Sequence, residues 1–166
     1  MKSRMEKEFV LIAATKGVIE GNWSKTIEFI KKQNPCWFPW TLDLYSKTKM
    51  GKEKINYIEE QMKSLGYIDL YIYFSKDRIG NSGEIEYVCR IIEISKERPI
   101  NEYLIAYEED EPPKTWFKTE EIKELDSFLN YEKDFLDYRG IIIDGSQFRK
   151  SIVLCKRKKR EGIDDL

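Results

Sequence analysis

The stretch YIDLYIYFS, residues 67–75, decides the fold class of this chain. Its aliphatic residues Ile68, Leu70 and Ile72 would all face one side of a strand, because successive side chains of a strand point to opposite faces. The next segment, residues 76–83, is rich in turn-forming residues. Residues 84–95 have the composition of a second long strand. The sequence therefore predicts an antiparallel hairpin.

The segments on either side of this hairpin supply further strands and three helices. Residues 8–15 are apolar on both faces, which is typical of a central strand. Asn22 is a good N-cap for a helix over residues 23–33, and Gly66 is a good terminator of a second helix over residues 52–65. Downstream we expect strands at residues 102–107, 114–118, 140–143 and 151–156, a short segment at residues 120–125, and a helix over residues 127–138.

This order of elements predicts an α+β fold, a small, mixed, mostly antiparallel β-barrel of about six strands with about three helices. A chain of 166 residues is long enough for one domain and too short for two comfortable ones. We expect that domain over residues 1–156. The tail, residues 157–166, continues the basic run that begins at Lys156 and is expected to lead to a further domain.

The composition excludes several classes of enzyme. The chain contains no histidine, so Ser-His-Asp and Cys-His nucleophiles and histidine metal sites are absent. The three cysteines are odd in number and far apart, which favours the reducing cytoplasm over a disulfide framework. No apolar run approaches the length of a membrane span. The abundance of Lys, Glu and Ile is typical of a thermophile, and we expect no cofactor.

The segment NPCWFPW, residues 34–40, carries three large aromatic residues within four positions. Pro35 and Pro39 argue against a helix or a central strand, because proline fixes φ and lacks an N–H. We expect a stiff loop that holds Trp37, Phe38 and Trp40. Two interpretations stay open at this point: the loop closes one end of the core, or an indole forms the wall of a ligand pocket.

A catalytic alternative rests on carboxylates. Asp110 with Glu121 and Lys123 has the residue types of a magnesium-dependent nuclease, in which two carboxylates hold the metal ion. A Glu-x-Lys pattern arises by chance in a chain this rich in Glu and Lys, so we expect no catalytic site. Trp116, in a short predicted strand, is more typical of a core residue.

The order of the elements and several short motifs resemble the PUA-like group, notably the EVE and YTH domains. The likeness includes the first strand FVLIA (residues 9–13), the tryptophan-containing segment after the first helix, and the hairpin. TWFK (residues 115–118) and GSQFR (residues 145–149) are similar to segments of EVE-like domains. The resemblance implies a small barrel that holds a flipped, modified base between aromatic walls.

The resemblance also implies roles for particular residues. Trp37 matches the cage tryptophan that follows the first helix in YTH domains, and the second wall falls to Trp40, Tyr103 or Tyr107. Trp23 and Phe38 lie near enough in sequence to contribute. The residues expected to read the base edge are Asn22, Asp43, Ser75 and Gln147, and those expected to bind phosphates are Lys47, Lys49, Lys76, Arg78, Arg149 and Lys150.

The sequence thus favours a non-catalytic module that binds double-stranded DNA carrying N6-methyladenine or a methylated cytosine. The resemblance to the DNA-binding domain of McrB-type proteins implies a modification-dependent restriction system, with an NTPase motor and a nuclease as partners. Three alternatives stay open: an RNA-binding PUA-like or ASCH-like module, a metal-dependent nuclease, and a protein-interaction domain. No membrane partner is expected.

Overall fold

The computed structural model describes residues 9–15, 23–33, 35–40, 48–74, 84–100, 114–143 and 152–158. None of the helices in these ranges is both long and apolar enough to cross a membrane. The elements in chain order are β1 (Val10–Thr15), α1 (Trp23–Lys32), β2 (Cys36–Trp40), α2 (Lys49–Leu65), β3 (Ile68–Phe74), β4 (Glu84–Ser95), β5 (Thr115–Asn130), α3 (Tyr131–Asp134), β6 (Phe135–Asp137) and β7 (Ile152–Arg157).

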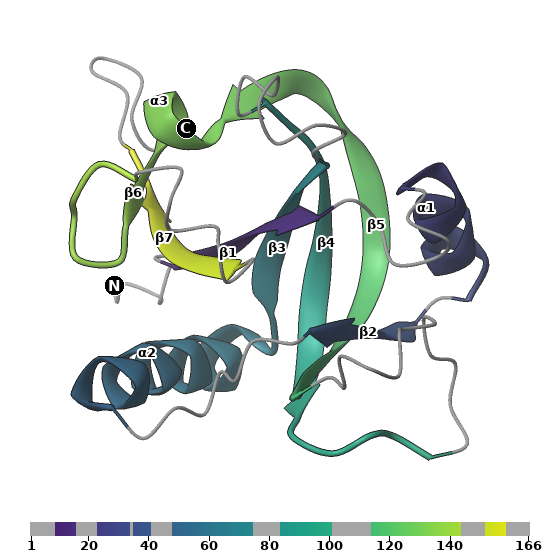
Figure 1. Ribbon diagram of the computed structural model, residues 1–166, viewed down its shortest axis with the longest axis horizontal. Coiled ribbons are helices and arrows are strands. Elements are labelled where there is room, and N and C mark those ends of the chain that lie inside the picture. The colour runs from purple at the N-terminus through teal and green to yellow at the C-terminus, as the bar shows by residue number, and fades with distance from the viewer. Residues whose placement is uncertain are drawn as a thin grey trace.

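The seven strands form one mixed sheet in the order β2-β5-β4-β3-β1-β7-β6 (Figure 1). Only β1 and β3 run parallel, and every other neighbouring pair is antiparallel. The predicted hairpin is confirmed as β3 and β4, in which Leu70 pairs with Cys89. The predicted central strand is confirmed too, because β1 lies between β3 and β7 and buries both Leu11 and Ile12.

The sheet is strongly curled but open, so the expectation of a closed barrel is wrong for the part of the chain that the structure describes. Its two edge strands, β2 and β6, do not pair with each other there. Both edges are poor templates for closure. β2 contains Pro39, which has no N–H to donate to a ladder, and β6 is only three residues long. The α+β class and the mostly antiparallel sheet are confirmed.

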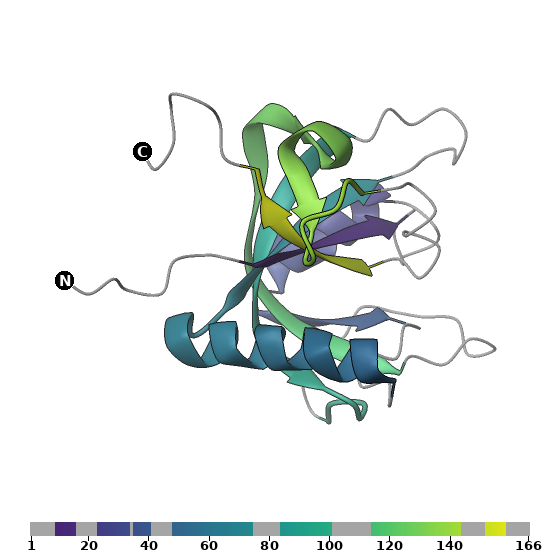
Figure 2. The same cartoon turned by 90° about the vertical axis from the view of Figure 1, so that its left-hand side faces the viewer.

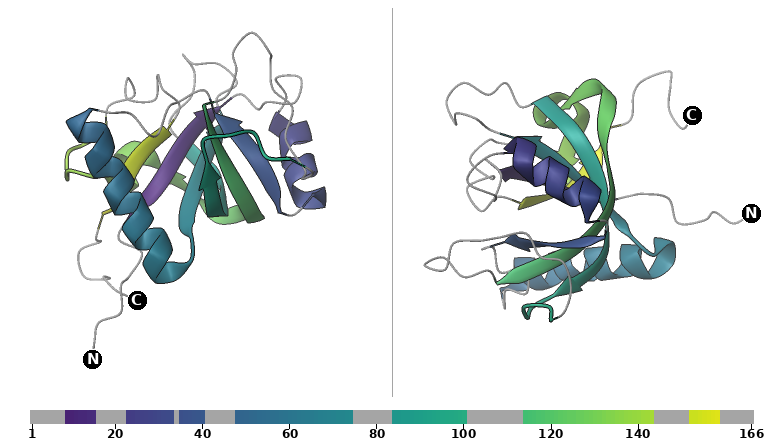
Figure 3. Two further views of the ribbon diagram at one scale, coloured as in Figure 1. Left: turned by 90° about the horizontal axis from the view of Figure 1, so that it is seen from below. Right: turned by 90° about the vertical axis from the view of Figure 1, so that its right-hand side faces the viewer.

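Two apolar cores lie on the two faces of the sheet. The larger core takes Leu11, Leu70 and Phe117 from the strands, together with residues of α1 and α2. The smaller core takes Ile12, Phe135 and others from β1, β3, β4, β5, β6 and β7. The two long helices lie at opposite ends of the curled sheet, and both contribute residues to the larger core (Figure 3). Successive side chains of β1 therefore point alternately into the larger and the smaller core.

Helix α2 is tied to the start of β1 by one buried glutamine. The Gln61 side chain accepts a hydrogen bond from the backbone N–H of Phe9 at 2.8 Å and donates one to the Phe9 carbonyl. Gln61 is 2% exposed. A planar amide that donates and accepts in this way imitates the next strand of a sheet. It satisfies the backbone of the residue that leads into the central strand, and α2 lies along the sheet there (Figure 2).

The segment predicted as a helix over residues 127–138 is mostly extended, so that prediction is wrong. Strand β5 runs as far as Asn130, the single turn α3 follows, and β6 begins at Phe135. Asn130 caps this turn by accepting hydrogen bonds from the N–H groups of Glu132 and Lys133, at 2.9 and 3.0 Å. Phe135 is extended because it pairs with Arg157 of β7 and enters the smaller core.

Strand β5 also absorbs the expected short segment at residues 120–125. Its pairing with β4 shifts between Val88 and Arg90, so that two β5 residues lie opposite one residue of β4. Glu121 sits in this bulge with φ of 53°, the left-handed region that non-glycine residues rarely adopt. Its carboxylate is 3.4 Å from the Arg90 guanidinium. Bulges of this kind let a 16-residue strand bend with the curled sheet.

A buried carboxylate organises the turn after β6, where the predicted strand at residues 140–143 is reduced to one isolated bridge at Ile142. Asp137 is 1% exposed and accepts hydrogen bonds from the N–H groups of Arg139 and Ile141, at 2.9 and 3.0 Å. The Arg139 guanidinium donates a third at 2.9 Å. Burial alone would raise the pKa of Asp137, but these hydrogen bonds and the charge of Arg139 outweigh it and hold the pKa below the usual value of an aspartate.

We expect Asp137 to make the folded state sensitive to acid. Because its pKa is lower in the folded than in the unfolded chain, its ionised form contributes stability that is present above the unfolded value and lost as pH falls through the folded value. Asp137→Asn should remove this contribution. Urea unfolding at pH 7 and pH 3 should show a smaller pH effect in the variant than in the wild type. The exposed Glu93→Gln is the control, and an equal change in both variants would contradict the prediction.

Candidate functional site

The aromatic segment forms the edge strand β2, not the loop that the two prolines predicted. β2 pairs antiparallel with β5, Cys36 opposite Thr119 and Trp40 opposite Thr115. Edge strands tolerate proline because one side of the strand makes no ladder bonds. The sequence reasoning was right that Pro39 excludes a central strand, and wrong in extending that exclusion to an edge.

The pleat of β2 sends its aromatic residues to opposite faces. Cys36, Phe38 and Trp40 belong to the larger core. Trp37 lies between them in sequence and therefore points to the other face. Trp37 and Trp40 thus cannot serve as two facing walls of one cage, although both were candidates for that role.

Phe38 and Trp40 form part of a packed aromatic stack. Their ring centroids are 4.7 Å apart with an interplanar angle of 14°, and the Trp40 ring lies 6.0 Å from that of Phe117. Phe38 is fully buried and Trp40 is 5% exposed. The buried indole N–H of Trp40 makes no hydrogen bond within the described ranges. We therefore assign Phe38 and Trp40 to the core and not to a binding surface.

A second tryptophan shares the face that Trp37 occupies. In the β2–β5 register, Trp37 lies opposite Lys118 and Pro39 lies opposite Trp116. Trp37 and Trp116 are therefore diagonal neighbours across the ladder, a relation that separates residues by roughly 7–8 Å. The two indoles therefore lie on one face of the β2–β5 ladder.

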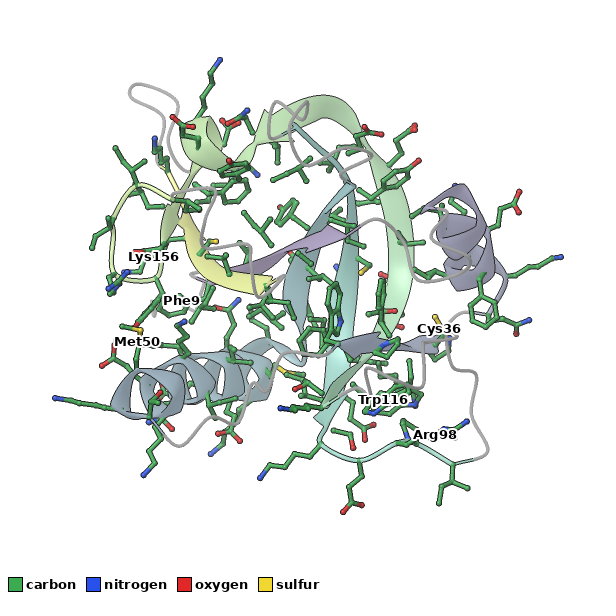
Figure 4. The ribbon with its side chains drawn as sticks, in the orientation of Figure 1. Phe9, Cys36, Met50, Arg98, Trp116 and Lys156 are labelled. Atoms are coloured by element: carbon green, nitrogen blue, oxygen red, sulfur yellow. The ribbon has the colours of Figure 1, made fainter. Side chains whose placement is uncertain are left out.

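Trp37 and Trp116 are closed off from solvent but belong to neither of the two core clusters. They are 3% and 2% exposed. The Lys118 ammonium lies 5.8 Å from the centre of the Trp37 ring, within the range of a cation–π interaction. In Figure 4 the labelled Trp116 lies in the same part of the molecule as Cys36 of β2 and Arg98. We call Trp37, Trp116 and Lys118 the tryptophan site.

The sequence reasoning missed Trp116 as a partner of Trp37. The signal was present in the alternation of two short segments, WFPW at residues 37–40 and TWFK at residues 115–118. To recognise the two tryptophans as neighbours, one must know that the two segments are adjacent strands and which residues of one strand pair with which residues of the other. A shift of one residue would place Trp116 on the opposite face.

Buried polar groups next to β2 are structural. The Thr119 hydroxyl donates a hydrogen bond to the Cys36 carbonyl at 3.2 Å. Burial raises the pKa of the Cys36 thiol to about 11, although a hydrogen bond with Thr119 lowers it somewhat. Burial likewise raises the pKa of Cys89 and of Cys155. None of the three thiols is a thiolate at neutral pH, so none is suited to nucleophilic catalysis.

Most of the other predicted site residues lie outside the described ranges. Trp23 begins α1, but its side chain is not described. Lys49 is exposed at the start of α2. The residues that lie outside are Asn22, Asp43, Ser75, Tyr103, Tyr107 and Gln147 of the predicted base site, and Lys47, Lys76, Arg78, Arg149 and Lys150 of the predicted phosphate contacts.

The carboxylates of the nuclease alternative can be placed only in part. Asp110 lies outside the described ranges, and Glu121 is paired with Arg90, whose guanidinium also stacks on the Tyr67 ring at 4.2 Å. No group of three or more acidic or cysteine side chains among the described residues could hold a metal ion.

Chemically, the tryptophan site contains two buried indoles and one cation. Such a set suits a planar ligand that gains from stacking and carries or lies near a negative charge. It supplies no nucleophile and no general base. In comparisons with known proteins, no family model matches this chain, and no curated protein sequence matches it either.

Proposed function

We propose that this chain is a non-catalytic, PUA-like module that recognises a modified base in double-stranded DNA by flipping it between Trp37 and Trp116. The proposal rests on one observation: the β2–β5 register brings these two indoles to one face of the sheet as diagonal neighbours. Trp116 takes the place of the second wall that the resemblance to YTH domains requires. We propose the cytoplasm as its location and a restriction motor and nuclease as its partners.

The energies of stacking and extrusion favour a two-walled site. Stacking one base on an aromatic side chain contributes about 1–3 kcal/mol, and taking a base out of a duplex costs a few kcal/mol. Two walls can therefore offset the extrusion, whereas one cannot. A single methyl group contributes about 0.8 kcal/mol when buried. Exclusion of water from the closed site is thus needed for a sharper preference for the modified base.

The burial of both indoles has a consequence for binding. At 3% and 2% exposure, Trp37 and Trp116 can accept a base only when the groups that cover them move apart. The apparent affinity is then reduced by the fraction of molecules in the open state. We expect slow association with a duplex, and faster association when the target base is already unpaired.

The decisive experiment measures binding of two duplexes that differ only in one N6-methyladenine, and of a matching pair with methylcytosine. We expect the wild type to prefer one modified duplex. Trp37→Ala should weaken that complex by about 5- to 150-fold, since it removes one stacking surface, and Trp37→Phe should restore most of the affinity. 2-Aminopurine placed next to the modified base should change its fluorescence on binding to the wild type, because flipping removes its stacking neighbour, and not on binding to Trp37→Ala.

Two controls separate binding from folding and DNA from RNA. Circular dichroism and thermal unfolding establish whether Trp37→Ala remains folded, and Trp37→Phe keeps the test valid if it does not. Equal affinity for modified and unmodified duplexes would overturn the proposal. Stronger binding to unmodified single-stranded RNA in competition would favour an RNA-binding module instead.

A further inference from the structure

A basic surface lies where the first turns of α2 meet the end of β7 and the turn after β6. We define it as Lys49, Lys52, Lys54, Arg139 and Lys156. Lys49, Lys52 and Arg139 are exposed, and Lys54 and Lys156 are half-buried. Among the described residues, two carboxylates lie beside these cations: Asp137, which pairs with Arg139, and Glu53, whose negative charge raises the pKa of Tyr138.

A chain of aromatic contacts fixes cations from three elements next to one another. The Lys54 ammonium and the Arg139 guanidinium each lie 5.6 Å from the centre of the Tyr138 ring. The Tyr138 ring is 6.0 Å from Tyr57, and Tyr57 is 4.6 Å from Phe9.

The Lys156 ammonium completes the chain at 5.4 Å from the Phe9 ring. Figure 4 shows Lys156, Phe9 and Met50 gathered on this side of the molecule. The aliphatic stems of Lys54 and Lys156 thus lie over apolar rings, which restricts the conformations of the two side chains. Less side-chain entropy is then lost when they bind an anion.

The charges of α2 run against what favours an isolated helix. Its first turn contains no acidic residue and begins with Lys49, and Lys52 follows in the next turn. Cations at the N-terminus of a helix oppose the helix dipole and are unfavourable there. A local charge arrangement that opposes the helix dipole is typical of a functional surface.

We propose that this basic surface binds the phosphate backbone of the nucleic acid on which the tryptophan site acts. The inference rests on the proposed function, which names the nucleic acid as the ligand, and it adds where the phosphate backbone of that nucleic acid contacts the protein. Arg139 uses one N–H for Asp137, and a guanidinium has five donors, so it can bind a phosphate as well. Lys49 and Lys52 add point charges on the outer face of the same helix end. These contacts carry no sequence information, so they supply affinity and not discrimination.

The test compares Lys49→Gln/Lys52→Gln with the wild type on the modified duplex and its unmodified counterpart, over a range of salt concentrations. Loss of two phosphate contacts should lower the slope of log affinity against log salt by about 1.8, that is, about 0.9 for each contact. The loss of affinity between 50 and 200 mM salt should then become about tenfold smaller. Both duplexes should weaken by the same factor. Lys63→Gln, at the other end of α2, is the matched control.

The outcomes separate this inference from the proposed function. A reduced slope with no preference for the modified duplex keeps the basic surface and overturns the base-reading function. An unchanged slope, or an equal reduction in Lys63→Gln, overturns the basic surface. Binding to phosphatidylserine vesicles that the double variant abolishes, with DNA binding unchanged, would assign the surface to lipid and overturn the inference. Both substituted lysines are exposed, so the variants are expected to fold, and thermal unfolding checks this.

Discussion

Gln61→Ala is expected to lower the free energy of unfolding by about 2–6 kcal/mol. The substitution leaves the N–H and the carbonyl of Phe9 without their buried partner, and each unsatisfied buried group costs about 1–3 kcal/mol. Typical domains are stable by only 5–15 kcal/mol, so the variant should be partly unfolded at moderate temperature. Urea unfolding followed by circular dichroism measures the difference.

Two variants identify the cause of this loss. Gln61→Met keeps most of the volume and removes both hydrogen bonds, so it should be nearly as destabilising as Gln61→Ala. Glu60→Ala changes the exposed neighbour on the same helix and should lie within about 0.5 kcal/mol of the wild type. If Gln61→Met is as stable as the wild type, the loss in Gln61→Ala comes from a cavity and not from the backbone of Phe9.

Phe38→Ala is expected to cost about 3–5 kcal/mol, because Phe38 is fully buried and stacks on Trp40 in the larger core. The truncated side chain leaves a cavity on an edge strand whose only pairing is with β5 in the described part of the chain. β2 should therefore detach before the rest of the sheet unfolds. Hydrogen exchange of the β2 amides, compared with those of β3, would show this local opening.

A matched comparison tests the assignment of faces on β2. If Phe38 belongs to the core and Trp37 to a ligand site, Phe38→Ala should reduce stability more than Trp37→Ala, although tryptophan is the larger residue. The reverse order would place Trp37 in the packed interior and weaken the case for a base-binding site. Phe38→Leu should recover a large part of the lost stability, since it refills most of the volume.

The fold could be predicted from the sequence where the hydrophobic periodicity of a segment and the turn-forming or helix-ending residues next to it indicate the same element. The alternation of residues 67–75 and the turn chemistry after it gave the β3–β4 hairpin, and the apolar stretch before Thr15 gave a central strand. Helix α2 followed from its apolar stripe and from Gly66, which adopts φ of 85° at the C-cap.

The predictions failed where long-range pairing overrides local pattern. Leu129 and Leu136 are seven residues apart, a spacing that suits a helix, yet Leu129 lies in β5 and Leu136 in β6. The reason is that β4 and β7 supply pairing partners that the sequence does not display. The partnership of Trp37 and Trp116 was hidden for the same reason. Residues on different strands become neighbours only through a register that no local pattern fixes.

The position of β1 has a consequence for how the protein is made. Leu11 is among the first described residues to leave the ribosome, yet it pairs with Leu70 on one side and with Leu154 on the other. The middle of the sheet therefore stays incomplete until Leu154 has been synthesised. In the meantime the nascent chain exposes an apolar strand with an unpaired edge. Cells producing this protein should thus rely on chaperones that shield the early chain, and truncations before Ile152 should aggregate.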